Sequence, residues 1–234
     1  MAILRDLFRA VAAGAGSLLA QDCLLCASTS GDTLLCPACE ADLPHLNQPR
    51  CPVCALPTSQ GDVCGTCLRE PPHFDATTAL FVYAHPVDRM IQALKYQRRL
   101  AIARYLGRAL SNSAPRSTDV LVGLPLHPQR LRDRGFNQAV ELARPVVGAL
   151  GVPLLLEAVV RDANPAPQAS LPWSERRRNV RGSFRCVADL SGKRVLVVDD
   201  VMTTGATLSE CAKSLKARGA ARVENLVVAR TLPP

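Results

Sequence analysis

From residue 74 onward, apolar positions alternate between short continuous runs, which predict buried strands, and one-face spacing, which predicts helices. The runs that predict strands lie at 79–83, 120–122, 152–160, 195–198 and 223–228. The spacing that predicts helices lies at 87–96, 102–110, 137–150 and 207–217. Alternating strands and helices predict an α/β fold with a parallel, doubly wound sheet. Ligands of such sheets bind beyond the carboxyl ends of the strands, so the segments after residues 122 and 198 are the candidate site.

Residues 1–20 carry a different pattern. Arg5 and Arg9 precede an apolar stretch at 10–20 that resembles a secretory signal, but Gly14 and Gly16 interrupt it. Apolar residues at 4, 7, 8 and 11 instead favour a short amphipathic helix. No apolar run in the sequence approaches the roughly 20 residues that span a bilayer, so we expect no membrane span.

Eight of the ten cysteines lie between residues 23 and 67 and form four Cys-x-x-Cys pairs. The pairs are Cys23 and Cys26, Cys36 and Cys39, Cys51 and Cys54, and Cys64 and Cys67. A shift of 28 residues superimposes the first two pairs on the last two, so the segment is an internal repeat. Two such pairs can turn four sulfur atoms toward one ion, which gives the closed tetrahedral shell of a structural zinc site.

We therefore expect residues 21–70 to form a double zinc ribbon with two structural zinc ions. The segment is short and poor in large apolar residues, so the metal would supply much of its folding free energy. The simplest pairing is sequential, with one ion for each repeat, and a crossed pairing stays open. Disulfides are the alternative for a secreted chain. Cys186 and Cys211 are isolated, and we expect both to be small core residues.

The strand expected at 195–198 leads directly into Asp199 and Asp200, and a threonine-rich segment then opens the next helix. That segment consists of Thr203, Thr204, Gly205, Ala206 and Thr207. Backbone amides at a helix start, together with threonine hydroxyls, form a cradle for an anion. The carboxylates can accept hydrogen bonds from ribose hydroxyls or act through Mg²⁺. The loop fits a phosphorylated ribose if both carboxylates are accessible near the helix, and a generic turn with acidic decoration is the alternative.

Basic residues offer further contacts for an anion. The formal net charge of +8 suggests an anionic partner, and a solvated basic surface explains it equally well. Arg130, Arg132 and Arg134 follow the strand expected at 120–122 and could neutralise a pyrophosphate. The segment that begins at Asn164 lacks periodicity, and long loops of this kind often close over substrates. Trp173 within it could stack on a base or pack inside the loop.

Residues 195–207 resemble the signature of type I phosphoribosyltransferases at every position. The resemblance implies that Asp199 and Asp200 act on the ribose of phosphoribosyl pyrophosphate as the catalytic pair, and that residues 203–207 hold its 5′-phosphate. It also implies a pyrophosphate-binding loop made of Leu124, Pro125, Leu126, His127, Arg130 and Arg134. By position, Arg176, Arg178 and Asn179 would belong to the flexible loop of this superfamily.

The threonine-rich segment at 203–207 is called the phosphate loop from here on, after the group it is expected to hold. The cysteine array and the phosphate loop together closely resemble the ComF family, which comprises competence-associated, phosphoribosyltransferase-like proteins with an N-terminal zinc ribbon. Further matching pieces are the residues at 94–96, 134–138 and 171–180. The resemblance implies a small zinc-ribbon module followed by a type I phosphoribosyltransferase-like domain at 74–234. It also implies a bacterial cytoplasmic protein linked to DNA uptake, with other competence proteins as partners.

Two functions stay open at this point. In the favoured one the protein is a transferase that binds phosphoribosyl pyrophosphate with Mg²⁺, and its acceptor is unknown; Lys95 and Tyr96 could face the site from a hood at 75–100. In the other, the same fold binds single-stranded DNA or senses phosphoribosyl pyrophosphate without catalysis. Aromatic residues make up only 4% of the chain, which disfavours a dedicated base-stacking groove. A weaker alternative uses the ribbons only as a docking module.

Overall fold

The computed structural model describes residues 21–161 and 182–233, and the chain divides into two compact units at residues 43 and 44. The amphipathic helix expected at 1–20 and the loop expected to close over the site at 164–180 lie outside the described residues. Each unit has its own set of buried residues and is described separately.

The first unit, described from residue 21 to residue 43, is built around the first cysteine repeat. Strands β1 (Gln21–Asp22) and β2 (Thr29–Gly31) pair antiparallel, and helix α2 (Pro37–Ala41) follows. Pro37 stands at the start of this helix, where its missing N–H costs nothing. Large apolar side chains are scarce here, and Leu35 and Leu43 are the buried ones among the described residues. A core of this size cannot hold the fold by itself, so cross-linking through the cysteines has to contribute.

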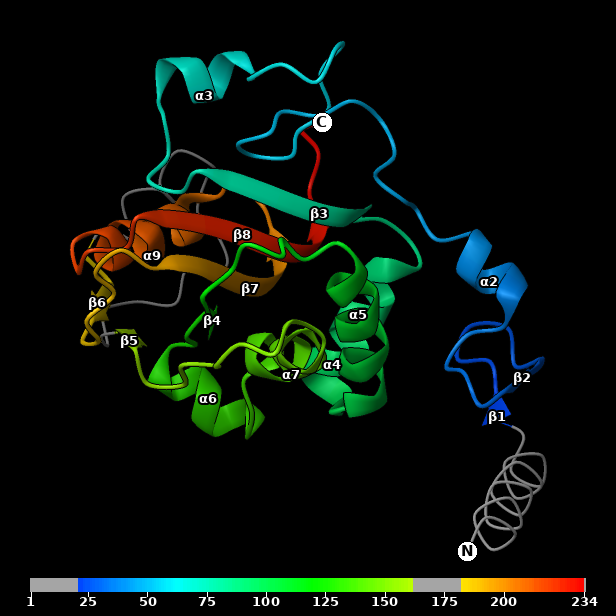
Figure 1. The fold of residues 1–234 in the computed structure, drawn as a ribbon. Coiled ribbons are helices and arrows are strands. Elements are labelled where there is room, and N and C mark those ends of the chain that lie inside the picture. The colour runs from blue at the N-terminus through cyan, green and yellow to red at the C-terminus, as the bar shows by residue number, and fades with distance from the viewer. Residues whose placement is uncertain (1–20, 162–181, 234) are drawn as a thin grey trace, which may run out of the picture. The chain divides into compact units, whose positions relative to one another are not determined.

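The second unit is organised around a four-stranded parallel sheet (Figure 1). Its strands are β3 (Ala76–Val82), β4 (Val120–Gly123), β7 (Arg194–Met202) and β8 (Arg222–Arg230). Their order across the sheet is β3-β8-β7-β4, and every neighbouring pair is parallel. The central strands β7 and β8 are almost entirely buried, as continuous apolar runs of parallel sheets usually are. The predicted α/β fold with a parallel sheet is confirmed.

Helices cover both faces of this sheet. Helices α4 (Val87–Gln97), α5 (Leu100–Asn112) and α7 (Gln138–Leu150) lie on one face, and α9 (Ala206–Lys216) lies on the other (Figure 1). Short antiparallel strands β5 (Val159–Arg161) and β6 (Phe184–Cys186) accompany α9. Along β7, Val195 and Val197 join the core that contains Leu208 and Cys211 of α9. Since strand residues alternate between faces, the intervening residues of β7 point toward α4, α5 and α7.

The second cysteine repeat packs with the sheet. It precedes β3 and ends in helix α3 (Gly65–Arg69), and it lies beside the β3 edge in Figure 1. Backbone bonds join the two segments: Thr77 N–H donates to the Pro52 carbonyl at 3.2 Å, and Leu46 N–H donates to the Leu80 carbonyl at 2.8 Å. Cys51, Cys54 and Cys67 are buried in the same core as α9. The domain limits 21–70 and 74–234 stay a prediction. What the structure shows is that the second repeat packs on the sheet of the unit that follows it.

Two segments differ from the sequence-based expectations. The strand expected at 152–160 is reduced to β5 at 159–161, while Leu154 forms an isolated bridge with Leu121 beside β4. The basic segment after β4, expected as a loop, contains helix α6 (Pro128–Arg134). None of its residues is buried, so it lacks the apolar face by which a helix is recognised in a sequence. No helix among the described residues is long and apolar enough to cross a membrane.

Candidate functional site

The phosphate loop joins β7 to α9 at the carboxyl end of the sheet. Gly205 caps α9 with a φ of 80°, a left-handed conformation that favours glycine. A Cβ atom at this position would lie 2.6 Å from Met202 Cε and 3.5 Å from Phe74 Cζ, so the space also requires glycine. The Thr204 hydroxyl accepts a hydrogen bond from the Ala206 amide at 3.1 Å. The turn thus holds a fixed backbone at the start of an eleven-residue helix, where amides favour anions.

The two carboxylates at the end of β7 are more buried than the sequence suggests. Asp199 is 8% exposed and Asp200 is 4% exposed. Asp200 Oδ2 lies 2.7 Å from Lys95 Nζ, which reaches it from α4. Burial, and then the neighbouring Asp200 carboxylate, raises the pKa of Asp199 well above its usual range, while Lys95 and Arg161 act in the opposite direction. Each acid therefore has a basic side chain near it, which limits the cost of burying the charge.

Both carboxylates nevertheless line a cavity of about 150 Å³ beside the phosphate loop. The other residues around this cavity that were singled out from the sequence are Lys95, Leu124, Pro125, Leu126, Arg130, Thr203, Gly205 and Thr207. The expectation of open carboxylates is thus corrected: the acids form part of the wall of a small pocket. They do lie close to the start of α9, as a ribose and phosphate site requires.

The loop after β4 faces the phosphate loop across the same cavity. Leu124 N–H donates to the Val198 carbonyl at 2.9 Å, so β4 and β7 stay paired up to the site. Asn137 holds this loop from the other side: its Nδ2 donates to the Leu124 carbonyl at 3.0 Å, and its Oδ1 accepts from Ala139 N–H at 2.9 Å and caps α7. His127 has a local role, because its Nδ1 accepts from Gln129 N–H at 3.1 Å and caps α6. The loop is therefore braced by helix caps on both sides.

A second, more basic cavity of about 420 Å³ adjoins the first. Lys95, Leu126, Arg130 and Gln138 line both cavities, and the second one adds Tyr96, Arg98, Asp133 and Arg134. The Arg134 guanidinium carbon lies 5.8 Å from the centroid of the Tyr96 ring, and Arg134 also donates to Gln138. Tyr96 is 77% exposed, which is unusual for an aromatic side chain. The pocket next to the carboxylates thus combines an aromatic face with positive charge.

Sequence reasoning did not single out three of the polar residues at this site. Gln138 lines both cavities, and Arg161 acts electrostatically on Asp199 from β5. Arg230 ends β8 and donates to the carbonyls of Met202 and Thr203 in the phosphate loop. A charged residue that closes an apolar strand at the carboxyl edge is the signal that could have identified Arg230. The flexible-loop candidates Arg176, Arg178 and Asn179 lie outside the described residues.

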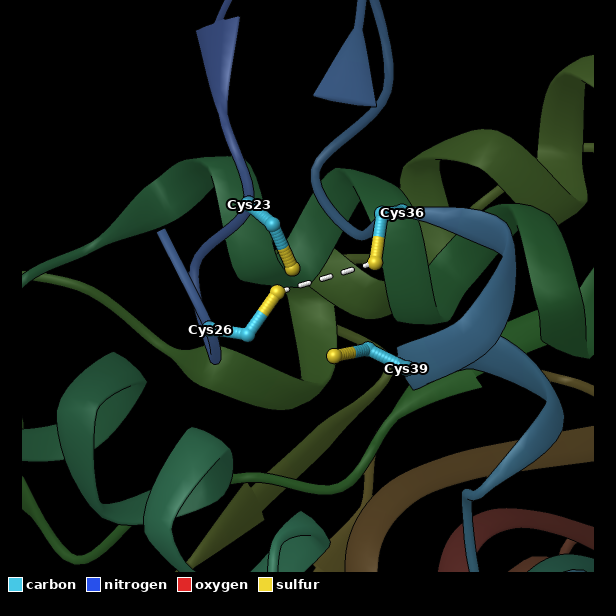
Figure 2. Close-up of side chains that lie close together, drawn as sticks. All are labelled: Cys23, Cys26, Cys36 and Cys39. Carbon is cyan, nitrogen blue, oxygen red and sulfur yellow. Dashed lines mark hydrogen bonds between the residues drawn. The ribbon is translucent and has the colours of Figure 1, made fainter. Parts of the chain in front are cut away.

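The eight clustered cysteines form two sites of four sulfur atoms each. Figure 2 shows the sulfur atoms of Cys23, Cys26, Cys36 and Cys39 turned toward one another. Within each group the four Sγ atoms lie within 4.8 Å of one another, and the groups follow the sequence order predicted for them. Zn–S bonds of about 2.3 Å in a tetrahedron place sulfurs roughly 3.8 Å apart. The Cys26–Cys36 and Cys54–Cys64 Sγ separations of 3.7 and 3.6 Å fit this geometry and are far too long for disulfides.

Zinc binds cysteine as the thiolate, and the thiols within each group differ in how readily they ionise. The pKa values of Cys54 and Cys67 are raised, chiefly by burial and then by neighbouring cysteines, and the pKa of Cys39 is raised by Cys26 and then by burial. At least one thiol in each group has a lowered pKa. Burial alone would raise the pKa of Cys51, but the backbone amides of Cys64, Cys54 and Val53 outweigh it and lower the pKa to about 7. In the first repeat the same balance between burial and backbone amides lowers the pKa of Cys23 to about 6. Cys186 and Cys211 are buried single cysteines, as expected of core residues. The residues present thus fit two structural zinc ions.

Comparisons with known families agree with both halves of this description. The family of the double zinc ribbon domain matches residues 15–68, and the family of the phosphoribosyl transferase domain matches residues 92–232. The fold and the two sites thus define a protein that combines a phosphoribosyl transferase domain with an N-terminal double zinc ribbon.

Similarity to named proteins identifies the family within this class. The chain is 37% identical over 191 residues to DNA utilization protein YhgH of Escherichia coli strain K12, covering 78% of this chain and 84% of that protein. It is 32% identical to Competence protein F of Haemophilus influenzae, covering 71% and 78%, and 26% identical to Competence protein ComFC of Bacillus subtilis, covering 86% and 85%. The chain belongs to the ComF family.

Among solved structures, the glutamine phosphoribosylpyrophosphate amidotransferase of B. subtilis matches with a TM-score of 0.37 and 25% identity. That match covers 53% of this chain and 25% of the other, so this chain spans about a quarter of that protein.

Proposed function

We propose that this protein binds phosphoribosyl pyrophosphate with Mg²⁺ and transfers the phosphoribosyl group to an acceptor that the sequence and structure do not identify. One observation carries the proposal: Asp199, Asp200 and three residues of the phosphate loop line a single cavity together with residues 124–126. The three loop residues are Thr203, Gly205 and Thr207. The cavity pairs an anion cradle with two acids, and a phosphorylated ribose presents the matching phosphate and diol.

Each part of the cavity has a role in this proposal. Backbone amides and hydroxyls of residues 203–207 hold the 5′-phosphate, and the paired acids accept hydrogen bonds from the ribose hydroxyls. Arg130 lies on the opposite wall, where it can neutralise the pyrophosphate that leaves when the bond at C1 of the ribose breaks. Mg²⁺ would supply charge neutralisation on the same leaving group. Lys95 orients Asp200 through their 2.7 Å contact.

The biological setting follows from the relatives. Their names refer to DNA utilization and to competence. We extend this to the present chain as a link to DNA uptake, with competence proteins as partners, in the cytoplasm. Reducing conditions there would keep the eight clustered cysteines available for zinc.

A second candidate function is non-catalytic binding of single-stranded DNA, or sensing of phosphoribosyl pyrophosphate. The specific observation in favour of DNA is the basic cavity around Tyr96, Arg98, Arg130 and Arg134. Exposed aromatic rings next to basic side chains are how sequence-independent proteins hold single strands. The low aromatic content limits such contacts to a few bases.

Calorimetry with phosphoribosyl pyrophosphate and Mg²⁺ tests the favoured function. Asp199→Asn alone and Asp199→Asn/Asp200→Asn together should weaken binding at least about tenfold, because charged hydrogen-bond acceptors for the diol are lost. Asp189→Asn is the matched control: that acid is exposed and bonds only locally, to Ser191. Equal affinity in all four proteins, or no binding by the wild type, would remove this proposal.

Two further measurements separate catalysis from DNA binding. Pyrophosphate release, screened over bases, nucleotides and nucleic-acid ends, detects a transferase and identifies the acceptor. A salt titration of single-stranded DNA affinity, with wild type and Tyr96→Ala, tests the second candidate. Phosphate contacts predict a steep fall in affinity with salt, and stacking on Tyr96 predicts a loss of about 1–3 kcal/mol in the variant.

A further inference from the structure

Arg230 is a buried cation at the end of β8 whose guanidinium bonds to backbone carbonyls on two sides. The residue is 3% exposed. Its Nε donates to the Cys54 carbonyl in the second cysteine repeat at 2.8 Å. Its Nη1 donates to Met202 at 3.0 Å, to Thr231 at 2.8 Å and to Thr203. One side chain thus connects the second tetracysteine site to the backbone of the phosphate loop.

The charge of Arg230 needs an explanation, because a buried guanidinium is costly unless a negative group compensates it. Among the described residues no carboxylate forms an ion pair with it; its bonds go to carbonyl oxygens. Four thiolates around one divalent zinc ion leave a net negative centre. Loaded with zinc, the second tetracysteine site would be such a centre, and Arg230 bonds directly to the backbone carbonyl of one of its ligands, Cys54.

Other contacts join the same two regions. Phe74, which follows the second repeat, is buried and lies against Gly205 in the phosphate loop. Thr231 N–H donates to the Met202 carbonyl at 3.0 Å, directly beside Arg230. A cavity of about 500 Å³ is bounded by Cys54 and Cys67 on one side and by residues 204–206 on the other. Among these contacts, the Arg230 bridge is the one that bonds to backbone carbonyls of both regions.

We propose that Arg230 is a positioning residue through which the second tetracysteine site fixes the geometry of the phosphate loop. The thiolates of this site, gathered around zinc, would supply negative charge and hold the backbone of Cys54 in place. Arg230 bonds to the Cys54 carbonyl, and its Nη1 fixes the carbonyls of Met202 and Thr203. The backbone of Thr203 and Gly205, which line the candidate anion site, is held in place as a consequence. This inference rests on the proposed function insofar as the loop binds phosphoribosyl pyrophosphate. It assigns no such role to the first tetracysteine site, which belongs to the other compact unit.

The test uses the full-length protein and two pairs of variants. Arg230→Lys keeps the charge but loses the planar fork that reaches Cys54 and Met202 together. Its control is Arg222→Lys on the same strand, where the arginine is exposed and pairs with Glu224. Cys64→Ser disables the second site, and Cys36→Ser disables the first site in the matching position of the repeat.

We expect Arg230→Lys and Cys64→Ser each to weaken binding of phosphoribosyl pyrophosphate about 10- to 100-fold, the range typical of residues that orient a site indirectly. Arg222→Lys and Cys36→Ser should leave that affinity within about twofold. Elemental analysis should give two zinc ions per chain for both arginine variants and one for both cysteine variants. The double variant Arg230→Lys/Cys64→Ser should be no weaker than the worse single one, because both act through one bridge.

Hydrogen exchange separates failure of this inference from failure of the proposed function. Loss of the second zinc, by Cys64→Ser or by a chelator acting on wild-type protein, should speed amide exchange at residues 202–207 even without ligand. Faster exchange with no wild-type binding of phosphoribosyl pyrophosphate would keep the bridge and remove the proposed ligand. Unchanged exchange at 202–207 after loss of the second zinc would overturn the bridge. The experiment with a chelator uses wild-type protein, so it can be done even if a variant fails to fold. Cys64→His can still ligate zinc, so exchange in this variant should be slow, as in the wild type.

Discussion

The two halves of the double zinc ribbon share the same cysteine spacing but lie in different surroundings. In the first repeat Cys26 is exposed and Cys39 is half-buried, and the unit that contains them has few other buried side chains. In the second repeat Cys51, Cys54 and Cys67 are buried in the core that includes α9 and the sheet. An internal repeat therefore specifies the same metal geometry twice, while the rest of the chain decides what each metal stabilises.

This difference assigns separate energetic roles to the two ions. Metal in the first repeat stabilises a unit that could not fold without it. Metal in the second repeat stabilises the segment that packs beside β3 in the sheet-containing unit. Through Arg230 it also acts on the backbone of the phosphate loop. Experiments that treat the two repeats alike should therefore give different results.

The largest expected difference is in stability. Cys51→Ser should lower the free energy of unfolding of the sheet-containing unit by more than about 3 kcal/mol, because it removes a buried zinc ligand. Cys23→Ser, the matching change in the first repeat, should leave that transition within about 0.5 kcal/mol. Thermal unfolding followed by calorimetry checks both, with zinc content measured in parallel. Equal shifts of the main transition in the two variants would show that the repeats are not energetically distinct.

Much of the fold and part of the site could be predicted from the sequence, because both depend on local patterns. The apolar runs at 195–198 and 223–228 identify the two central strands, and the expected helix at 207–217 agrees with α9 to within a residue. The cysteine spacing likewise favours the sequential grouping, with a crossed one left open, and the sulfurs gather in the sequential way. The phosphate loop is one continuous segment, so its residues lie together whatever the rest of the chain does.

The remaining features depend on packing between distant segments. The Cys54–Arg230 bond joins residues 176 positions apart, and the Lys95–Asp200 pair joins α4 to β7. In neither pair does the sequence around one residue indicate which distant residue it contacts. Helix α6 was missed because a histidine cap, Pro128 and Gly135 define it without an apolar face. Burial of Asp199 and Asp200 arises from the helices on both faces of β7, which no single segment encodes.

A smaller effect is expected from a change in the phosphate loop itself, at Gly205, where the loop contacts Met202 and Phe74. Gly205→Ala should lower stability by about 1–3 kcal/mol and weaken anion binding, since it places a Cβ at a positive φ against Met202. Gly148→Ala, in an exposed turn of α7 with open space around it, should be neutral or stabilising by up to about 1 kcal/mol. Unfolding and binding of inorganic pyrophosphate check the pair. If Gly205→Ala instead left stability and pyrophosphate affinity unchanged, the close contact of the phosphate loop with Phe74 and Met202 would not contribute to the way the second repeat positions that loop.

The smallest effect concerns pH and should appear in only one of the two units. Burial, and then Asp200, raises the pKa of Asp199 in the folded protein. A carboxyl group with a raised folded-state pKa binds more protons folded than unfolded, so its contribution to stability falls as pH rises from the unfolded pKa near 4 through the folded value. Asp199→Asn cannot ionise, so it should flatten that slope and stabilise the sheet-containing unit at alkaline pH relative to the wild type. Calorimetric unfolding from pH 5 to pH 9 checks this, with Asp189→Asn as the exposed control. The first repeat lies in the other compact unit, so the unfolding transition of that unit should not change with Asp199→Asn. An equal shift of that transition would contradict the separate roles assigned to the two repeats.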